Sequence, residues 1–492
     1  MTITGERAET TARYRVAGEW REDATERTLP VVSPADGSLL GRVHEYTNDE
    51  IDEVFASGKK AQPRWGARPL TERADILHRF ADLLEAHADE MGEVLMMEVA
   101  KARKDARDEI VRSADYIRHT AEDAKRIIGE SQFSDSFPGQ ARNKLAVIHR
   151  VPLGTILAIP PFNYPVNLAV SKVAPGLVTG NAVVLKPPSQ GVLSALTMAE
   201  LAYEAGVPAD VLQVVTGRGS RIGDYLVQHP SVDLISFTGS SETGRDLAHK
   251  AGMIPLMLEL GGKDAAIVLA DADLDATAKD IVAGAFSYSG QRCTAVKRVL
   301  VMESVADELV ARIAERARAL TVGSVQDNST VTPLVDPESA EGAERMINDA
   351  VAAGATVVTG GTREGNLVQP TVVDHVTTEM DIAWIEPFAP LLPVIRVSTP
   401  AEAIKISNAS EYGLQGAIFT SDIDIAIQIA NRLDVGTVQV NGRTARGPDH
   451  FPFLGTKSSG MGTQGVGPSI EAMTRVKSLV VNLREKDLHA RS

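Results

Sequence analysis

The sequence predicts an α/β protein that contains two parallel β-sheets. From about residue 150 onward, short apolar runs typical of buried strands alternate with segments of helical periodicity. The alternation restarts after Gly261, which indicates two α/β units joined near residue 260. A chain of 492 residues with 43% hydrophobic and 23% charged residues contains enough apolar material for large cores.

The first unit is expected to follow a long helix. Residues 70–100 are expected to form one amphipathic helix, because Leu77, Phe80 and Leu84 recur at helical spacing between charged residues. Residues 121–145 are polar and irregular and are expected to leave the main body. The strands of this unit are expected at 155–160, 182–186, 211–215 and 234–237, with helices at 109–119, 167–178 and 193–205.

The second unit repeats the alternation and is followed by a separate apolar run. Residues 476–483 are strand-like but lie far from either unit in the sequence, so pairing with another subunit is one expectation. The strands of the second unit are expected at 265–269, 296–301, 357–359, 392–397, 416–420 and 435–440, with helices at 274–288 and 305–320.

Composition excludes several classes of function. The formal charge is −15, from 65 acidic and 50 basic side chains, which disfavours binding to nucleic acid. No apolar stretch is long enough to span a bilayer, and residues 1–16 lack the apolar segment of a secretory signal, so we expect a cytoplasmic protein. An anionic ligand would have to be met by local arginines and lysines.

Cys293 is the only cysteine of the chain, within Ser-Gly-Gln-Arg-Cys-Thr-Ala. A single thiol forms neither an internal disulfide nor a cysteine-based metal site, and no metal is expected. Gly290 allows close backbone approach, and Arg292 favours a thiolate. The local sequence leaves two interpretations open, a nucleophile or a small buried filler.

Two motifs follow predicted strands and are candidates for cofactor binding. The turn from Phe237 to Gly244 precedes a helix, and backbone N–H groups at a helix N-terminus bind phosphate. Lys186 ends a strand and would point into the crevice where parallel sheets bind ligands, with the hydroxyl of Ser189 nearby. A purely structural turn and a solvated loop lysine are the alternatives.

Two polar residues are candidates for catalysis. Glu259 stands between two leucines before a glycine pair, and apolar surroundings would favour a general base. Asn163, in Pro-Phe-Asn-Tyr-Pro, offers an amide that can stabilise an oxyanion. A solvated strand-end glutamate and a turn-forming asparagine are the alternatives.

Taken together, the ordered motifs resemble the aldehyde dehydrogenase superfamily over roughly residues 140–470, with Glu386-Pro-Phe and Asn441 completing the series. The segments around Cys293 and Asn163, with Arg446-Gly and His450-Phe-Pro-Phe-Leu-Gly, resemble the narrower group of non-phosphorylating, NADP-dependent glyceraldehyde-3-phosphate dehydrogenases. The resemblance implies a Rossmann-type dinucleotide-binding domain, an α/β catalytic domain and a small β oligomerisation element. The implied boundaries are 1–120 and 146–258, 259–450, and 121–145 with 451–492 including the C-terminal tail.

The resemblance also implies roles for individual residues. Cys293 would be the nucleophile, Glu259 the base that activates water, and Asn163 an oxyanion donor. Lys186 and Ser189 would hold the adenosine ribose and its 2′-phosphate, Ser240 would contact the pyrophosphate, and Glu386 would hold the nicotinamide ribose. The remaining expected contacts are Gly217, Gly239, Gly244 and Phe388 for the cofactor, and Arg112, Tyr164, Arg292 and Arg446 for the substrate phosphate.

The implied reaction is the irreversible oxidation of D-glyceraldehyde 3-phosphate to 3-phosphoglycerate with NADP, through a cysteine thiohemiacetal and thioester, without inorganic phosphate. The alternatives are an NADP-dependent enzyme for another acidic aldehyde such as succinate semialdehyde, a cofactor-independent cysteine esterase, and a non-catalytic binding protein. The resemblance suggests a homotetramer. Ser189 stands where we expect threonine, Phe162 stands where many members of the superfamily have tryptophan, and Arg443 has no assigned role.

Overall fold

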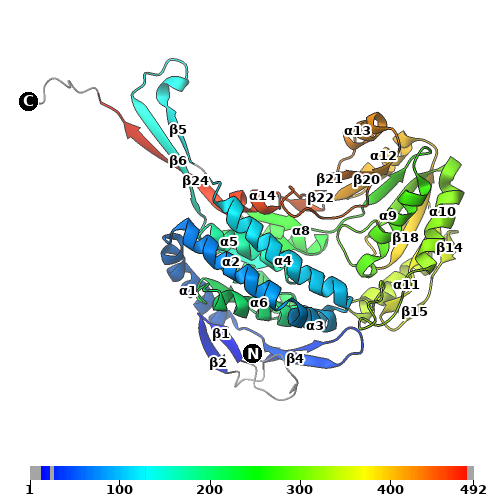
Figure 1. Cartoon of the computed structure of the whole chain (residues 1–492), viewed down its shortest axis with the longest axis horizontal. Coiled ribbons are helices and arrows are strands. Elements are labelled where there is room, and N and C mark those ends of the chain that lie inside the picture. The colour runs from blue at the N-terminus through cyan, green and yellow to red at the C-terminus, as the bar shows by residue number, and fades with distance from the viewer. Residues whose placement is uncertain (1–12, 23–26, 128, 485–492) are drawn as a thin grey trace, which may run out of the picture.

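A computed structural model describes residues 13–22, 27–127 and 129–484. Within these residues, two α/β bodies lie side by side and a narrow β arm projects from the first body (Figure 1). The sequence-based expectations for residues 1–12 and for the tail from 485 lie outside the described residues.

The first body is built on a sheet with strand order β23-β11-β10-β7-β8-β9. Strands β7 to β11 are parallel, and β7 to β10 follow the predicted positions closely, whereas the sequence analysis missed β11. Strand β23 joins the edge antiparallel to β11. The residues of β23 come from the segment 451–492, so this part of the predicted oligomerisation element belongs to the first sheet. The strands are β7 (Thr155–Ile159), β8 (Ala182–Leu185), β9 (Leu212–Val214), β10 (Leu234–Thr238), β11 (Leu256–Glu259) and β23 (Gly460–Met461).

Helices cover both faces of this sheet, and one of them differs from the sequence-based prediction. The expected single helix over 70–100 is wrong, because the chain forms α2 (Leu70–Ala86) and α3 (Ala88–Val99). His87 leaves the helical conformation, with φ −103° and ψ 17°, and apolar periodicity does not reveal such a one-residue break. The other helices are α1 (Asn48–Gly66), α4 (Arg103–Ala124), α5 (Asn167–Val178), α6 (Val192–Glu204), α7 (Gly219–Val227), α8 (Ser241–Lys250) and α14 (Val466–Ala472).

The second body is built on a sheet with strand order β14-β17-β18-β13-β12-β20-β21. Its strands are parallel except β14, which pairs antiparallel with β17. The sequence analysis missed β17. The elements are β12 (Ala265–Val268), β13 (Arg298–Met302), β14 (Thr356–Thr359), β17 (Thr371–Asp374), β18 (Leu391–Val397), β20 (Gln415–Phe419), β21 (Thr437–Val440), α9 (Leu274–Phe286), α10 (Glu303–Arg318), α11 (Pro337–Ala352), α12 (Pro400–Ala409) and α13 (Ile423–Ala430).

The arm is a three-stranded sheet of β5 (Glu130–Phe133), β6 (Lys144–Pro152) and β24 (Thr474–Asn482). On one side, β24 pairs with β6 of its own chain over nine residue pairs, which the sequence did not predict. Its exposed apolar side chains include Val476 and Leu479, each 58% exposed. The arm therefore presents an apolar edge strand to the surroundings.

The remaining elements are short. They are β1 (Arg13–Val16), β2 (Glu19–Glu22), β3 (Thr28–Val32), β4 (Leu39–His44), β15 (Arg363–Glu364), β16 (Leu367–Val368), β19 (Tyr412–Gly413), β22 (Thr456–Lys457) and three 3₁₀ turns at Ser134–Ser136, Ser287–Gly290 and Asp381–Ala383.

No helix in the described part of the chain has the length and apolar character needed to cross a membrane.

The first body depends on apolar packing between α2, α4 and α5. Leu77 on α2 is fully buried in this core. Replacement of Leu77 by alanine is expected to lower the free energy of unfolding by about 2–5 kcal/mol, because it removes buried methyl groups and leaves a cavity. Denaturant unfolding would measure this loss, with Leu39→Ala as the control because Leu39 is 52% exposed. Equal stability of Leu77→Ala and wild type would contradict the packing described here.

Candidate active site

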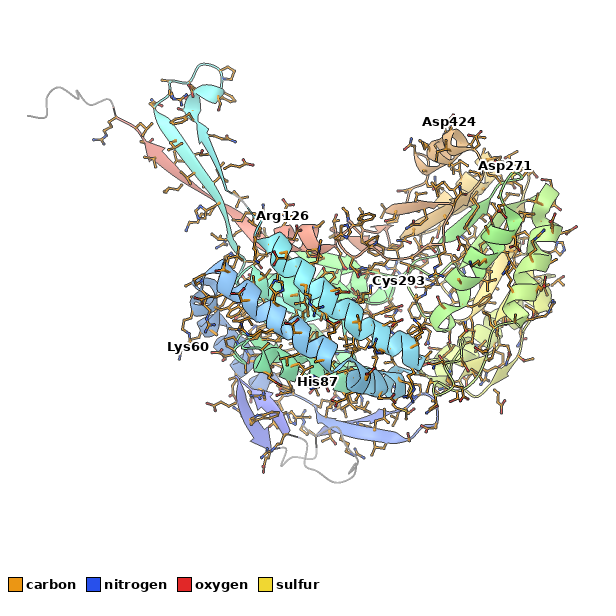
Figure 2. The ribbon with its side chains drawn as sticks, viewed as in Figure 1. Lys60, His87, Arg126, Asp271, Cys293 and Asp424 are labelled. Atoms are coloured by element: carbon orange, nitrogen blue, oxygen red, sulfur yellow. The ribbon has the colours of Figure 1, made fainter. Side chains whose placement is uncertain are left out.

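Cys293 and Glu259 meet at the junction of the two bodies. Glu259 ends β11 of the first sheet. Cys293, labelled in Figure 2, follows the turn Ser287–Gly290 of the second body. The thiol of the half-buried Cys293 donates to Glu259 Oε1, with 3.4 Å between sulfur and oxygen. This contact between residues from two sheets favours a reactive thiol over an inert filler.

The backbone before Cys293 has an unusual conformation that holds the loop in place. Tyr288 and Ser289 have positive φ values of 51° and 54°, which non-glycine residues rarely adopt. Gly290 also has φ +70°, and a β-carbon there would collide with the carbonyl of Ala389. The Ser289 hydroxyl donates to Thr332 O at 2.7 Å. Such strain is maintained only where surrounding contacts determine the conformation.

Asn163 lies beside the same loop. Its Nδ2 donates to the backbone oxygen of Gln291 at 2.8 Å. Behind it, the buried Lys101 Nζ donates to Asn163 O at 2.7 Å and forms an ion pair with Glu109. This ion pair locks the Asn163 loop against α4. The sequence analysis missed Glu109 and Lys101, and only Lys101, between two alanines, stood out as a charge among apolar neighbours.

The second oxygen of Glu259 is held by a guanidinium. Arg446 Nη1 donates to Glu259 Oε2 at 2.6 Å, and the Glu259 side chain is only 2% exposed. Burial lowers the pKa of Arg446, but Glu259 and Asp449 outweigh this and raise it. Burial and the Glu259 carboxylate raise the pKa of the Cys293 thiol, while Lys297 and Arg446 oppose that rise. The thiol is therefore protonated in this arrangement, with its proton directed at Glu259.

Lys172 is a further site residue that the sequence analysis missed. Its Nζ donates to Thr238 Oγ1 at 2.7 Å, and Thr238 Oγ1 donates to Glu259 Oε2 at 3.4 Å. Burial lowers the pKa of Lys172 to about 7, and Glu259 opposes this shift. The sequence offered one sign of this role, a lysine within the largely apolar segment that forms α5. All residues of α5 are buried.

The four predicted phosphate-binding residues lie close to one another near Cys293. Arg112 forms a bidentate ion pair with Asp449, at 2.6 and 2.7 Å, so it is not a solvated helix arginine. Tyr164 interacts electrostatically with both Arg112 and Arg292. Among the described residues, Arg292 Nε and Arg446 Nη2 are buried N–H groups without a hydrogen-bond partner. Unpaired buried donors favour the binding of an anion.

The predicted adenosine contacts lie at the carboxyl edge of the first sheet. Lys186 is only 6% exposed, and burial lowers its pKa to about 8. Its ammonium donates to Pro187 O at 3.0 Å. Ser189 is half-buried three residues later. Gly217 has φ +152°, and a β-carbon there would lie 2.8 Å from Ile222. A phosphate beside Lys186 would offset the effect of burial and raise the pKa of this lysine again, so these residues fit a 2′-phosphorylated ribose.

The predicted pyrophosphate turn opens α8. The Ser240 side chain caps this helix by accepting from Thr243 N at 3.2 Å. A β-carbon at Gly239 would collide with the Phe237 ring, and one at Gly244 would collide with Leu260. The turn therefore requires glycine at both positions for packing, and it leaves the helix N-terminus accessible to a phosphate.

Glu386 and Phe388 approach from the second body. Gly262 N donates to Glu386 Oε1 at 3.2 Å, and Lys297 pairs with the same carboxylate oxygen. Phe388 lies 5.8 Å from the Phe162 ring, edge to face, with a positive φ of 45°. Both residues thus lie at the junction that also contains Cys293. Asn441 instead exchanges two hydrogen bonds with the backbone of Thr420, 21 positions earlier, and Arg443 is exposed with no assigned role.

The titration of Lys172 predicts how stability depends on pH. Between pH 7 and about 10, the unfolded chain holds a proton at this lysine that the folded chain has released. The stability of wild type relative to Lys172→Met is therefore expected to increase as the pH rises through this window. Denaturant midpoints of both proteins at pH 7, 8 and 9 would measure the difference. A constant or decreasing difference would contradict a neutral Lys172 in the folded chain.

The geometry agrees with the comparisons to known proteins. The model of the aldehyde dehydrogenase family matches residues 20–479. The NADP-dependent glyceraldehyde-3-phosphate dehydrogenase of Streptococcus equinus is 52% identical over 475 residues, covering 96% of this chain and 99% of the relative. The Triticum aestivum protein of the same name is 51% identical over 473 residues, covering 96% and 95%.

A solved structure gives the same result. The NADP-dependent glyceraldehyde-3-phosphate dehydrogenase of Bacillus halodurans C-125, complexed with NADP, superposes with a TM-score of 0.95. It is 52% identical, and the match covers 97% of this chain and 100% of that one. The α/β fold predicted from the sequence is confirmed, and the chain belongs to the aldehyde dehydrogenase family.

Proposed function

We propose that this protein oxidises D-glyceraldehyde 3-phosphate to 3-phosphoglycerate irreversibly, with NADP and without inorganic phosphate. The observation that carries the proposal is a thiol 3.4 Å from a buried carboxylate, next to arginine N–H groups that are buried and unpaired within the described residues. The relatives named above act with NADP on the same aldehyde according to their names.

Cys293 and Glu259 perform the covalent step. As the sulfur attacks the aldehyde carbon, Glu259 accepts the thiol proton and a C–S bond forms. The oxyanion of this thiohemiacetal is stabilised by the backbone N–H of Cys293 and by Asn163. The Asn163 amide has two N–H donors, of which one is used by Gln291 O. Each oxyanion donor contributes on the order of 3 kcal/mol.

Glu259 also performs the hydrolytic step. Held by Lys186, Ser189 and Glu386, NADP would supply the hydride acceptor for the thiohemiacetal carbon, and loss of that hydride leaves a thioester on Cys293. After Glu259 has released its first proton to solvent, it removes a proton from a water molecule whose oxygen attacks the thioester carbonyl. The C–S bond then breaks, Glu259 returns this proton to the Cys293 thiolate, and the product acid loses its proton to solvent and leaves as a carboxylate. Arg446 and Thr238 hold the Glu259 carboxylate in position for both proton transfers.

The substrate phosphate is assigned to the surface formed by Arg112, Tyr164, Arg292 and Arg446. Arg292 and Arg446 offer free buried donors, and Asp449 orients Arg112. A carboxylate would also bind these arginines, so succinate semialdehyde remains the nearest alternative substrate. A cofactor-independent esterase would leave the glycines around α8 and the buried Lys186 without a function.

The exposed strand of the arm suggests how the protein assembles. We propose a homotetramer that uses the arm, because β24 exposes Val476 and Leu479 on an edge strand. The cytoplasmic location stays a prediction from the sequence.

A spectrophotometric assay tests the proposed function. NADPH is expected to form from glyceraldehyde 3-phosphate in the absence of inorganic phosphate, at a kcat/KM well above that for succinate semialdehyde. A higher kcat/KM for succinate semialdehyde, or a requirement for inorganic phosphate, would refute the proposal. Ester turnover without any dependence on NADP would support the esterase instead.

Arg292 is the sharper probe of phosphate recognition, because Arg446 also contacts Glu259. Replacement of Arg292 by glutamine is expected to raise KM for glyceraldehyde 3-phosphate roughly ten- to 150-fold, since one charge-assisted hydrogen bond contributes about 1.5–3 kcal/mol. KM for unphosphorylated glyceraldehyde should change much less. Arg432→Gln is the matched control, since Arg432 is exposed. Equal losses on both aldehydes would remove Arg292 from the phosphate site.

Lys186 is expected to determine the preference for NADP. Replacement by methionine removes the cation assigned to the 2′-phosphate and should lower kcat/KM with NADP at least tenfold, while kcat/KM with NAD changes little. The ratio of the two constants measures the effect. An unchanged ratio, or a wild-type enzyme that prefers NAD, would contradict this assignment.

A further inference from the structure

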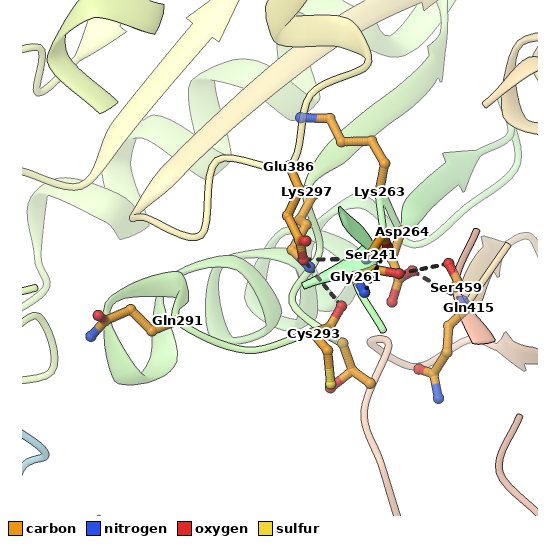
Figure 3. A network of polar contacts seen from close by, with 12 residues as sticks. Ser241, Gly261, Lys263, Asp264, Gln291, Cys293, Lys297, Glu386, Gln415 and Ser459 are labelled. Carbon is orange, nitrogen blue, oxygen red and sulfur yellow. Dashed lines mark hydrogen bonds and ion pairs between the residues drawn. The ribbon is translucent and has the colours of Figure 1, made fainter. Parts of the chain in front are cut away.

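Lys297 joins the two halves of the site and has no role in the mechanism above. Its side chain is 2% exposed. The ammonium donates to the backbone oxygen of Cys293 at 2.6 Å and also pairs with Glu386 Oε1 (Figure 3). It also lies 5.7 Å from the centre of the Phe388 ring. One buried cation thus contacts the nucleophile's own peptide and a residue expected to hold the nicotinamide ribose.

The two oxygens of the Glu386 carboxylate have different surroundings. Oε1 accepts from Lys297 and from Gly262 N at 3.2 Å. Within the described residues, no hydrogen bond reaches Oε2, and this oxygen lies close to the backbone of Gly261. Glu386 is therefore fixed through one oxygen, which leaves the other free to accept from a ribose hydroxyl.

The contact with Cys293 acts on the nucleophile in a different way. A donor at the Cys293 carbonyl fixes the peptide that follows the sulfur-bearing residue, and so limits rotation of its backbone. The same ammonium places positive charge beside the thiol, in opposition to burial and to Glu259. Lys297 itself is held by its backbone N–H, which donates to Asp264 O at 3.0 Å.

We propose that Lys297 is a positioning residue that couples cofactor binding to the nucleophile, by holding Glu386 for the nicotinamide ribose and by fixing and activating Cys293. This coupling depends on the proposed function in one respect, namely that Glu386 binds the nicotinamide ribose of NADP. Both contacts use one ammonium, so loss of this charge affects the thiol and the nicotinamide half of the cofactor site together.

The charges around the thiol determine how the test is read. Glu259 faces Cys293 from β11, Lys172 from α5, and Arg446 from the loop after β21. Asp264 acts from the segment before β12, and its carboxyl has a pKa raised to about 7 by burial. Substitution of Lys297 leaves all of these groups in place, so a change in thiol reactivity reports the loss of its ammonium.

The test combines thiol alkylation with cofactor binding in the full-length protein. Cys293 is the single cysteine, so uptake of iodoacetamide reports on it alone. In Lys297→Met, alkylation at pH 7 is expected to be about tenfold slower, because loss of the cation raises the pKa of the thiol by roughly one unit. Calorimetry should show at least tenfold weaker binding of NADP, with unchanged binding of adenosine 2′,5′-bisphosphate, which lacks the nicotinamide ribose.

Three variants complete the design. Lys263→Met is the matched control, because burial and the neighbouring cations hold the pKa of Lys263 well below its ordinary value, and its Nζ donates to Ile385 O at 2.7 Å. Its alkylation rate should stay within about threefold of wild type. Lys297→Arg should recover part of the alkylation rate. Glu386→Gln should alkylate faster than wild type while it binds NADP more weakly, and this variant tests the proposal if Lys297→Met does not fold.

The proposal is overturned if Lys297→Met alkylates like wild type across the pH range and binds NADP normally. It is also overturned if Lys263→Met shows the same losses, or if Glu386→Gln changes neither quantity. None of these measurements uses an aldehyde. A protein that failed to oxidise glyceraldehyde 3-phosphate would therefore refute the proposed function and leave this test intact.

Discussion

The site depends on a buried carboxylate that is shared between a thiol and a guanidinium. Glu259 is nearly inaccessible to water, yet one of its oxygens faces Cys293 and the other faces Arg446. Removing a carboxylate from water costs several kcal/mol unless charges and hydrogen bonds compensate for it. Arg446 supplies that compensation, and it does so from the loop after β21, so the base exists only when both sheets are assembled against each other.

The same constraint explains the number of buried cations around the junction. The chain carries a net charge of −15, but Lys172, Lys297, Arg292 and Arg446 are collected in one small region. Burial lowers the pKa of Lys172 and of Arg292, so each would gain from a nearby anion. A site of this kind is costly when empty and favours ligands that bring negative charge, which fits both a phosphorylated aldehyde and a dinucleotide.

Rigid contacts around the nucleophile complete this design. Tyr288 and Ser289 have left-handed backbone conformations, and hydrogen bonds to Val99 and Thr332 hold them there. The Lys101–Glu109 ion pair holds the Asn163 loop from the other side. Because both supports are buried, the thiol and the amide have little freedom to move apart. This is the kind of preorganisation that lets hydrogen-bond donors stabilise a developing oxyanion.

The sequence alone determined the alternation of strands and helices, since burial of each parallel strand on both faces leaves a local apolar signature. It also identified Cys293, Glu259 and Asn163 as candidates, because each lies in a short motif. The tertiary structure decided what such local patterns do not contain. The contacts Arg446–Glu259 and Lys172–Thr238 join residues 187 and 66 positions apart, and β24 pairs with β6 across more than 300 residues. Packing decides which distant side chains meet, and it is packing that gives Lys172 and Lys297 partners that no local pattern indicated.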